Sequence, residues 1–210
     1  MTIELENIGK RFNNEWIFKN VNLRFEPGSH TGIVGPNGSG KSTLLQCISG
    51  FLTTSEGKIH YHYPSSAAIE IEKIYRHVSI AAPYLFQDEW LTFREAVEIQ
   101  TKFKPLKATI SVDDVIERSG LSASQNKFLR QFSSGMKQRV RLILAILADT
   151  DLLLLDEPLS NLDDSGAQWF QELMQQECSD RTVIICSNHH AAELATVSSR
   201  IDIAQFKPNG

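Results

Sequence analysis

Residues 35–43 read Gly-Pro-Asn-Gly-Ser-Gly-Lys-Ser-Thr, and this run restricts the possible folds more than any other feature of the chain. It matches the phosphate-binding loop G-x-x-x-x-G-K-[ST], which connects a buried strand to the first turn of a helix. The apolar residues 31–34 precede the run, and residues 42–49 follow it with apolar side chains at helical spacing and Gly50 as a stop signal. The sequence therefore predicts a strand, a glycine-rich loop and a helix, in this order.

A loop of this kind binds phosphate mainly through its backbone. Its glycines allow N–H groups to converge on phosphate oxygens, and the helix N-terminus adds the positive end of its dipole. We expect Lys41 to reach the β- and γ-phosphates of a nucleoside triphosphate and the Ser42 hydroxyl to bind Mg²⁺. The residues predicted to contact the nucleotide here are Gly35, Pro36, Asn37, Gly38, Ser39, Gly40, Lys41, Ser42 and Thr43.

An apolar run followed by two acids supplies the second motif. Residues 152–155 are all leucine, which is typical of a parallel strand buried on both faces, and Asp156, Glu157 and Pro158 follow directly. Ligands bind at the carboxyl ends of such strands. We expect Asp156 to hold Mg²⁺, directly or through water, and Glu157 to orient and polarise the attacking water as the general base. The alternative is an ordinary acidic strand-to-loop turn, and the phosphate-binding loop upstream favours the catalytic interpretation.

The phosphate-binding loop and the spacing of apolar residues together predict an α/β fold: a P-loop NTPase core with a parallel sheet, an N-terminal antiparallel β-subdomain and an inserted helical subdomain. Alternating apolar residues near the N-terminus, broken at residues 13–14 and 27–28, indicate antiparallel strands. From the glycine-rich loop onward strands and helices alternate, and the tail from Thr182 is predicted to form a strand and then a helix. We predict one domain over residues 1–210, in which residues 1–83 and 137–210 form the core and residues 84–136 the helical subdomain.

Composition argues against several other classes of protein. The net charge of −4 argues against broad electrostatic binding to nucleic acid or to an anionic membrane. Apolar runs stay well short of the roughly 18 residues that a membrane span requires, and residues 1–6 do not resemble a signal peptide. The three cysteines are scattered and form no CxxC pair, so we interpret them as small buried residues in a reducing compartment. These features predict a cytosolic protein.

Residues 132–139 read Phe-Ser-Ser-Gly-Met-Lys-Gln-Arg and lie shortly before the acidic strand, where Ser133 or Ser134 can cap a helix. With this run the chain resembles, over essentially its whole length, the nucleotide-binding subunit of ATP-binding cassette (ABC) transporters. In that family a motif similar to Ser133 through Gly135 binds the γ-phosphate of ATP held by a second subunit. The resemblance therefore implies ATP and Mg²⁺ as cofactors and a head-to-tail dimer for catalysis.

The same resemblance assigns roles to residues nearer the carboxyl end. Residues 160–163 are similar to the family's D-loop, whose aspartate, here Asp163, crosses the dimer interface. His189 follows a predicted strand and resembles the switch histidine that contacts the γ-phosphate, while His190 takes a position usually held by Asp. A lone histidine after a strand is more often a surface residue, but the spacing to Arg200 favours the switch role.

Two aromatic residues are candidates for the contact with adenine. Phe12 resembles the aromatic residue that stacks on adenine in this family, although a core residue at a strand edge is the alternative, and Trp16 is the local competitor. In the helix predicted after Ser133, Gln138 and Arg139 are interpreted as structural, because polar residues on a helix face usually are.

Besides His190, the sequence departs from the family pattern in two motifs. Pro83 stands where the family has a glutamine, and proline offers no side-chain donor or acceptor. This predicts weakened hydrolysis or altered coupling, unless Gln87 compensates through a loop that folds back. In the γ-phosphate motif Ser134 replaces a glycine and Met136 a glutamine, a form similar to that of exporters of the ABC-2 type.

Three functions are compatible with these motifs. The resemblance favours the ATP-hydrolysing subunit of a membrane transporter, on the cytoplasmic face of the cell membrane. Its partners would be a second copy or a related nucleotide-binding subunit, and a separate transmembrane permease. The second function is a non-transport ABC ATPase acting on ribosomes, DNA or a soluble partner; the sequence shows no basic tract, so no nucleic-acid partner is expected. The third is an ATP-dependent clamp with weak hydrolysis, which only Pro83 supports.

Overall fold

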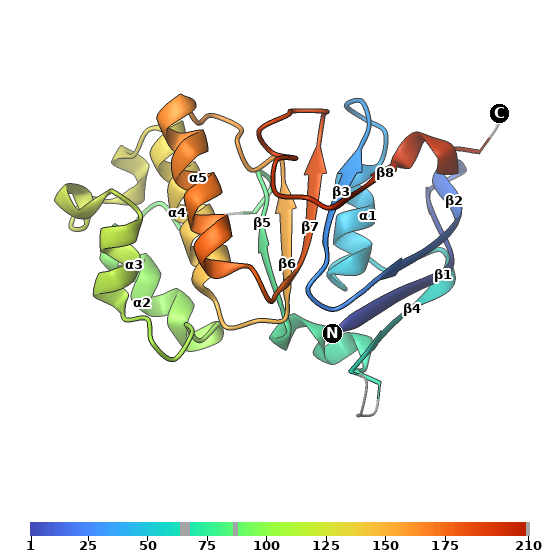
Figure 1. Cartoon of the computed structure of the whole chain (residues 1–210), viewed down its shortest axis with the longest axis horizontal. Coiled ribbons are helices and arrows are strands. Elements are labelled where there is room, and N and C mark those ends of the chain that lie inside the picture. The colour runs from blue at the N-terminus through green and yellow to red at the C-terminus, as the bar shows by residue number, and fades with distance from the viewer. Residues whose placement is uncertain (64–67, 86–87, 209–210) are drawn as a thin grey trace.

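A five-stranded parallel sheet forms the centre of the molecule. The computed structural model describes residues 1–63, 68–85 and 88–208, and Figure 1 shows its arrangement. The strands lie in the order β5, β6, β7, β3, β8, and every pairing between neighbours is parallel. The predicted α/β core with a parallel sheet is confirmed. The strands are β3 His30–Val34, β5 Val78–Ala81, β6 Leu152–Asp156, β7 Thr182–Ser187 and β8 Ser199–Asp202.

Helices cover both faces of this sheet. α1 lies on the face toward the N-terminal strands, whereas α4 and α5 pack together on the opposite face, with α2 and α3 outside α4 (Figure 1). The helices are α1 Lys41–Ile48, α2 Phe93–Phe103, α3 Val112–Arg118, α4 Ser134–Leu147 and α5 Asp164–Glu177. Short 3₁₀ helices cover Ile71–Arg76, Ser122–Ser124, Leu129–Gln131 and Ile203–Phe206.

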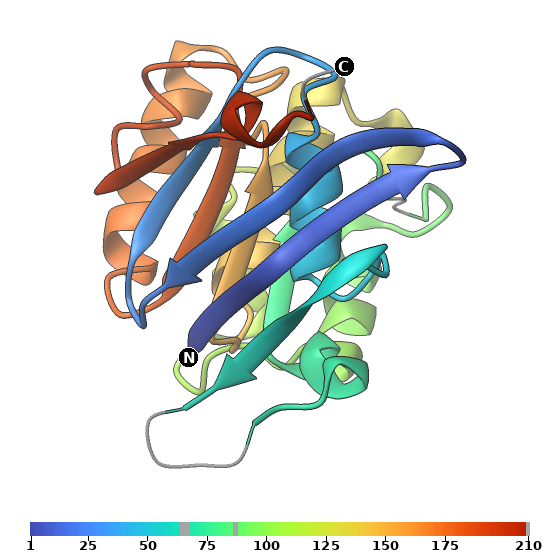
Figure 2. The same cartoon turned by 90° about the vertical axis from the view of Figure 1, so that its right-hand side faces the viewer.

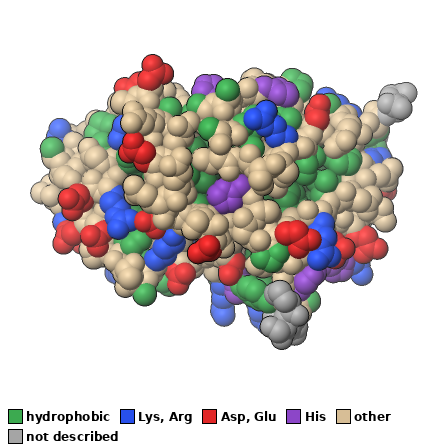
Figure 3. Space-filling model, viewed as in Figure 1, with side chains coloured by type: hydrophobic (Ala, Val, Ile, Leu, Met, Phe, Trp, Pro, Cys, Tyr) green, Lys and Arg blue, Asp and Glu red, His purple; other side chains and the backbone are tan. Residues whose placement is uncertain are grey.

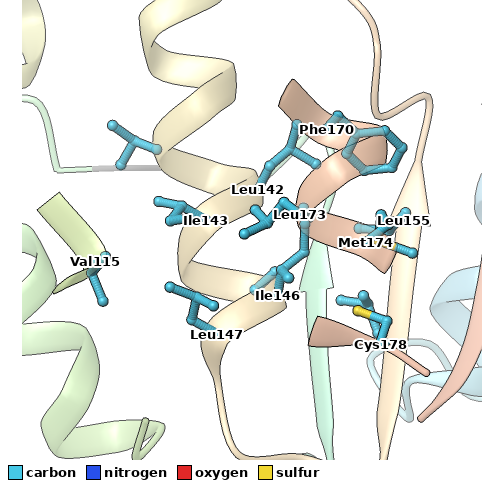
Figure 4. Packing of buried hydrophobic residues seen from close by; sticks show 14 of the residues in the cluster. Val115, Leu142, Ile143, Ile146, Leu147, Leu155, Phe170, Leu173, Met174 and Cys178 are labelled. Carbon is cyan, nitrogen blue, oxygen red and sulfur yellow. The ribbon is translucent and has the colours of Figure 1, made fainter. Parts of the chain in front are cut away.

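Strand β6 is buried on both faces, which explains its uninterrupted apolar sequence. Leu153 and Leu155 belong to the core shared with α4 and α5, and Figure 4 shows Leu155 beside the side chains of these helices. Leu152 and Leu154 point the other way because side chains alternate along a strand, and they belong to the core that contains α1. The two cores together fix the strand that ends at Asp156.

A second, antiparallel sheet lies against α1 (Figure 2). Its order is β2, β1, β4, and both pairings are antiparallel. Ile3, Leu5 and Phe25 of this sheet pack in the same core as Leu44 and Leu45 of α1. The antiparallel subdomain predicted from the alternating N-terminal sequence is confirmed. Its strands are β1 Thr2–Phe12, β2 Glu15–Phe25 and β4 Glu56–His62.

Capping boxes define the starts of α2 and α3. The Thr92 hydroxyl oxygen accepts a hydrogen bond from the Glu95 amide (3.3 Å), and the Glu95 carboxylate accepts one from the Thr92 amide (2.8 Å). Ser111 and Asp114 form the same reciprocal pair at α3. These helices lie within the predicted helical subdomain, while α4 crosses its predicted boundary at residues 136–137.

The prediction of a helix directly after β7 is wrong. Residues 188–198 form turns, and the chain then enters β8. The Ser198 amide donates to the His30 carbonyl oxygen (2.9 Å), and Leu194 packs on Gly32 so closely that a Cβ there would lie 2.7 Å from its side chain. Because these contacts draw the segment back to β3, tertiary structure overrides the local helical tendency.

The surface is mixed in charge. Acidic and basic side chains are interspersed over the face that Figure 3 shows. All three cysteines are buried free thiols, as the sequence predicts. Within the described part of the chain, no helix is both long and apolar enough to span a membrane.

Candidate functional site

The glycine-rich loop joins β3 to α1, as predicted. Gly40 precedes α1 with a φ of 104°, in the left-handed region that favours glycine. A Cβ on Gly40 would lie 2.7 Å from Cγ2 of Ile17, so strand β2 packs directly on the loop. Residues 37–43 line a cavity of about 240 Å³ together with Ile17 and Glu157. The cavity lies where the sequence predicts bound phosphates.

Lys41 is buried at this loop, with 4% of its surface exposed. Its Nζ donates to the carbonyl oxygens of Gly35 (2.8 Å) and Pro36 (3.0 Å). Carbonyl dipoles orient the ammonium group but do not neutralise its charge, and charge-assisted hydrogen bonds to phosphate are stronger than bonds to neutral acceptors. The loop therefore offers phosphate both its backbone N–H groups and the oriented ammonium group of Lys41.

Asp156 ends β6 next to the loop and is 2% exposed. Burial raises the pKa of Asp156, and the nearby Ser42 hydroxyl and Lys41 ammonium partly offset this shift. Among the described residues, its Oδ1 atom has no hydrogen-bond partner. A buried carboxylate oxygen with a free lone pair, beside a hydroxyl group, is a donor set that suits Mg²⁺.

Glu157 has an unusual backbone for a residue with a side chain. Its φ is 47°, in the left-handed region, and its amide donates to the Cys186 carbonyl oxygen of β7 (2.9 Å). Glu157 lines the cavity at the loop and also a second cavity of about 240 Å³. Glu157 therefore lies at the junction of the two cavities. The other residues of the second cavity are Asn37, Leu159, Ser160, Asn188, His190 and Glu193.

The two histidines after β7 are placed differently. His190 lines the second cavity with Glu157 and Asn188. His189, the predicted switch histidine, is exposed and has a φ of 59°. It is not among the described residues that line either cavity at the loop. The switch role of His189 therefore stays a prediction.

Ser133 and Asp163 lie at the starts of two helices. The side chain of Ser133 caps α4 and that of Asp163 caps α5, each by accepting a hydrogen bond from a first-turn amide. A Cβ on Gly135 would lie 2.8 Å from the carbonyl oxygen of Asn161, so the first turn of α4 touches the segment before α5 within one chain. Ser133 and Asp163 are exposed, and with Gly135 they lie outside the described linings of the two cavities.

The two aromatic candidates for adenine stacking differ in exposure. Phe12 ends β1 with 47% of its surface exposed, and Lys10 Nζ lies 5.0 Å from its ring centroid. The ring of Trp16 contacts two cations, with Lys19 Nζ at 4.1 Å and the Arg11 guanidinium at 5.4 Å. The Trp16 ring is thus occupied by its neighbours, while more of Phe12 is open to a ligand.

Pro83 lies in a turn just after β5. Gln87, the residue that could compensate for it, lies outside the described residues. Tyr84 is a residue that the sequence did not single out: burial, followed by the charge of Asp156, raises the pKa of Tyr84. The only local signal that Tyr84 lies near Asp156 was its position next to Pro83, which stands where the family has a glutamine.

Two buried polar residues beside the Glu157 segment were also missed. Gln138, interpreted as structural, is 1% exposed, and Glu193, not singled out at all, is 4% exposed. Their partners lie 20 and 34 positions away along the chain, so no local pattern marks them.

The fold and the site define a P-loop NTPase of α/β class. Residues 18–160 match the family model described as ABC transporter. The chain therefore belongs to the ABC transporter family, and it is an ATPase of that family with the role of ATP-binding subunit.

Similar proteins cover nearly the whole chain. It is 30% identical over 200 residues to the uncharacterized ABC transporter ATP-binding protein YybJ of Bacillus subtilis (strain 168). The matched region covers 93% of this chain and 88% of YybJ. It is 30% identical over 217 residues to the aliphatic sulfonates import ATP-binding protein SsuB of Bacillus cereus, covering 99% and 83%. The dimeric structure of MJ0796, a bacterial ABC transporter cassette, is similar with a TM-score of 0.78 at 25% identity, covering 96% of this chain and 95% of that one.

Proposed function

We propose that this chain binds ATP with Mg²⁺ and hydrolyses it through Glu157 to drive transport by a separate membrane permease. The observation that carries this proposal is the position of Glu157, which lines both the cavity at the phosphate-binding loop and the cavity beside it. An acid at this junction can reach a water molecule next to the terminal phosphate of a nucleotide held by the loop.

Ser42 and Asp156 would hold the Mg²⁺ ion, either directly or through water. Their oxygen atoms fit this ion, because the buried Oδ1 atom of Asp156 is without a partner in the described structure. A bound Mg²⁺ would offset negative charge on the phosphate oxygens. Lys41 and the loop amides would bind the same phosphates from the protein side, and Phe12 would stack on the adenine.

Glu157 would act as the base that orients and polarises the attacking water. Its amide is tied to β7, and its peptide carbonyl accepts a hydrogen bond from the Ser160 amide (3.0 Å), so the backbone that carries the carboxylate is fixed. Fixed groups need little reorganisation during reaction, which is the main source of electrostatic catalysis. His189 would contact the γ-phosphate after a movement of the turn that carries it.

A second nucleotide-binding subunit would complete each site. Ser133 and Asp163 are exposed at the N-termini of α4 and α5, and Gly135 lies in the first turn of α4. All three lie outside the described linings of the cavities in their own chain, which supports contact with ATP held by a partner. The similar cassette MJ0796 is described as dimeric. The partner would be a second copy or a related chain, arranged head to tail.

The relatives support a transporter over a non-transport ATPase. SsuB is named an import ATP-binding protein, so ATP binding serves transport in that system. By analogy this chain would bind the cytoplasmic face of a permease and lie at the inner side of the cell membrane.

The net charge of −4 supports protein rather than nucleic acid as its partner. The clamp with weak hydrolysis keeps Pro83 as its only support.

Affinity purification of the tagged chain from detergent-solubilised membranes of its native cell tests the transporter role. A multi-span membrane protein in stoichiometric amount is the expected result. Recovery of only ribosomal, DNA-bound or soluble partners would contradict the proposal and favour the non-transport ATPase.

A further inference from the structure

The peptide bond between Pro158 and Leu159 is held from both sides by buried side chains. Gln138 Nε2 donates to the Pro158 carbonyl oxygen (2.8 Å), and the Leu159 amide donates to Glu193 Oε1 (3.0 Å). The carbonyl and the amide belong to the same peptide unit, which starts one residue after Glu157. Both of its polar groups are therefore satisfied by side chains from distant segments.

Gln138 comes from α4, the helix that Ser133 caps. Its amide orientation is fixed, because Arg141 Nη1 donates to Gln138 Oε1 (3.1 Å) and leaves Nε2 facing Pro158. A glutamine that is 1% exposed, with both amide atoms engaged, has little freedom to turn. The start of α4 and the Glu157 segment are thus joined by a rigid link.

Glu193 comes from the turns after β7. Its second carboxylate oxygen accepts a hydrogen bond from the Ser187 hydroxyl (2.5 Å), and the oxygen of that hydroxyl accepts one from the His190 amide (3.1 Å). Glu193 therefore connects Leu159 to the end of β7 and, through Ser187, to the backbone of His190. Residues 188–190 are called the histidine segment below. It also lines the second cavity with Glu157.

Glu157 needs such support because its backbone is strained. A φ of 47° is unfavourable for a residue with a Cβ, and such conformations persist only where the surroundings impose them. Upstream, the Glu157 amide is bound to Cys186 on β7. Downstream, the Pro158–Leu159 peptide is bound to Gln138 and Glu193. Glu157 lies between these two fixed points.

We propose, building on the role proposed for Glu157, that Gln138 and Glu193 are positioning residues for this base. They hold the Pro158–Leu159 peptide and so keep Glu157 in its left-handed conformation. Through the same peptide, α4 and the histidine segment after β7 are coupled to the base. Loss of either residue then lowers the rate of hydrolysis more than the binding of ATP.

Steady-state hydrolysis by the transporter complex, or by the chain alone where it turns over, tests the proposal. For Gln138→Leu and Glu193→Met we expect kcat to fall about tenfold or more, while KM for ATP changes less than about twofold. Glu193→Gln retains an acceptor for the Leu159 amide, so we expect it to restore much of the rate lost in Glu193→Met. A double variant of Gln138→Leu and Glu193→Met should be little worse than the more severe single variant, because both act on one peptide.

Hydrogen exchange gives a readout that does not depend on turnover. We expect the Leu159 amide to exchange about tenfold faster or more in folded Glu193→Met, and also faster in Gln138→Leu. Matched controls are Gln125→Leu, which removes a glutamine that accepts from Arg94, and Glu177→Gln, which removes a carboxylate that pairs with Lys107. Both controls should keep the wild-type kcat and the wild-type exchange at Leu159.

Glu157→Gln measured in parallel separates this proposal from the one on which it builds. If Glu157→Gln hydrolyses ATP normally, the role of the base is wrong. If Glu157→Gln is inactive but the Gln138 and Glu193 variants keep normal kcat and normal Leu159 exchange, only the positioning role is overturned. Equal loss in Glu193→Gln and Glu193→Met, with Leu159 exchange unchanged, would also overturn it.

Discussion

Asp163 Oδ1 accepts a hydrogen bond of 2.8 Å from the Gly166 amide and thereby caps α5. The same carboxylate is the one that the family resemblance places across the dimer interface. One side chain therefore has a structural role within the chain and a predicted role between chains. Suitable substitutions can separate the two, because asparagine also caps helices whereas alanine does not.

For Asp163 we predict different outcomes for the two substitutions. Asp163→Ala should lower Tm by about 2–4 °C at neutral pH because the cap is lost. Asp163→Asn should keep Tm but weaken ATP-driven dimerisation, since it removes the charge. Calorimetry and size-exclusion chromatography with ATP measure the two effects. Normal dimerisation of Asp163→Asn would contradict the interface role.

The pH dependence of the Asp163 cap follows from the direction of its shift. The hydrogen bond from the Gly166 amide, followed by that from the Ser165 hydroxyl, lowers the pKa of Asp163. A lowered pKa in the folded state means that the stabilisation is present above the pKa of the unfolded chain and is lost as pH falls through the folded pKa. Asp163→Asn should therefore flatten the acidic limb of a plot of Tm against pH.

Glu157→Gln should leave ATP binding intact and lower turnover about a hundredfold or more. With hydrolysis blocked, the ATP-bound dimer should accumulate and elute ahead of the monomer on size exclusion. Glu98→Gln, an exposed acid on α2, is the control and should behave as wild type. A Glu157→Gln protein that stays monomeric with ATP, or turns over normally, would contradict the assignment.

Lys41→Ala should abolish detectable ATP binding, because it removes the charged donor of the phosphate-binding loop. The substitution also deletes two hydrogen bonds to loop carbonyls, so loop order should fall as well. Titration calorimetry with ATP measures the affinity, and the exposed Lys58→Ala serves as control. Retained affinity in Lys41→Ala would mean that the loop is not the nucleotide site.

Asp156→Asn should raise Tm by a few degrees in the absence of Mg²⁺. Burial raises the pKa of Asp156, so the folded state favours the protonated carboxyl, and the ionised form opposes folding above the folded pKa. Asparagine removes that charge. The variant should also lose the extra stabilisation that Mg²⁺ adds to ATP in the wild type, which a thermal shift with and without Mg²⁺ measures. A lower Tm, or an unchanged effect of Mg²⁺, would contradict the metal role.

Phe12→Ala should weaken ATP binding about fivefold to tenfold, and Trp16→Ala should weaken it less. The reason is that Phe12 is 47% exposed with one cation, Lys10, near its ring, whereas the half-buried Trp16 ring contacts both Lys19 and Arg11. The affinity for inorganic triphosphate, which has no base to stack, should stay the same in Phe12→Ala. The opposite order of ATP affinities would assign the adenine contact to Trp16.

Most of the architecture could be predicted from the sequence because it depends on local patterns. Ser133, one of the two serines that the sequence offers as a cap, caps α4, and β6 ends at the predicted Asp156. The tail after β7 could not be predicted, since its conformation depends on the Ser198 contact with His30 and on packing against Gly32. Such contacts join segments far apart in sequence and outweigh a weak helical tendency.

The phosphate-binding loop and the acidic strand follow from the order of residues alone, because glycine conformation, helix capping and strand burial are encoded by adjacent residues. The set of polar residues around Glu157 depends instead on how the chain packs. Gln138 and Glu193 meet one peptide from opposite sides, and His190 rather than His189 lines the cavity. These relations arise when β6, β7 and α4 pack together, so no single segment of the chain carries them.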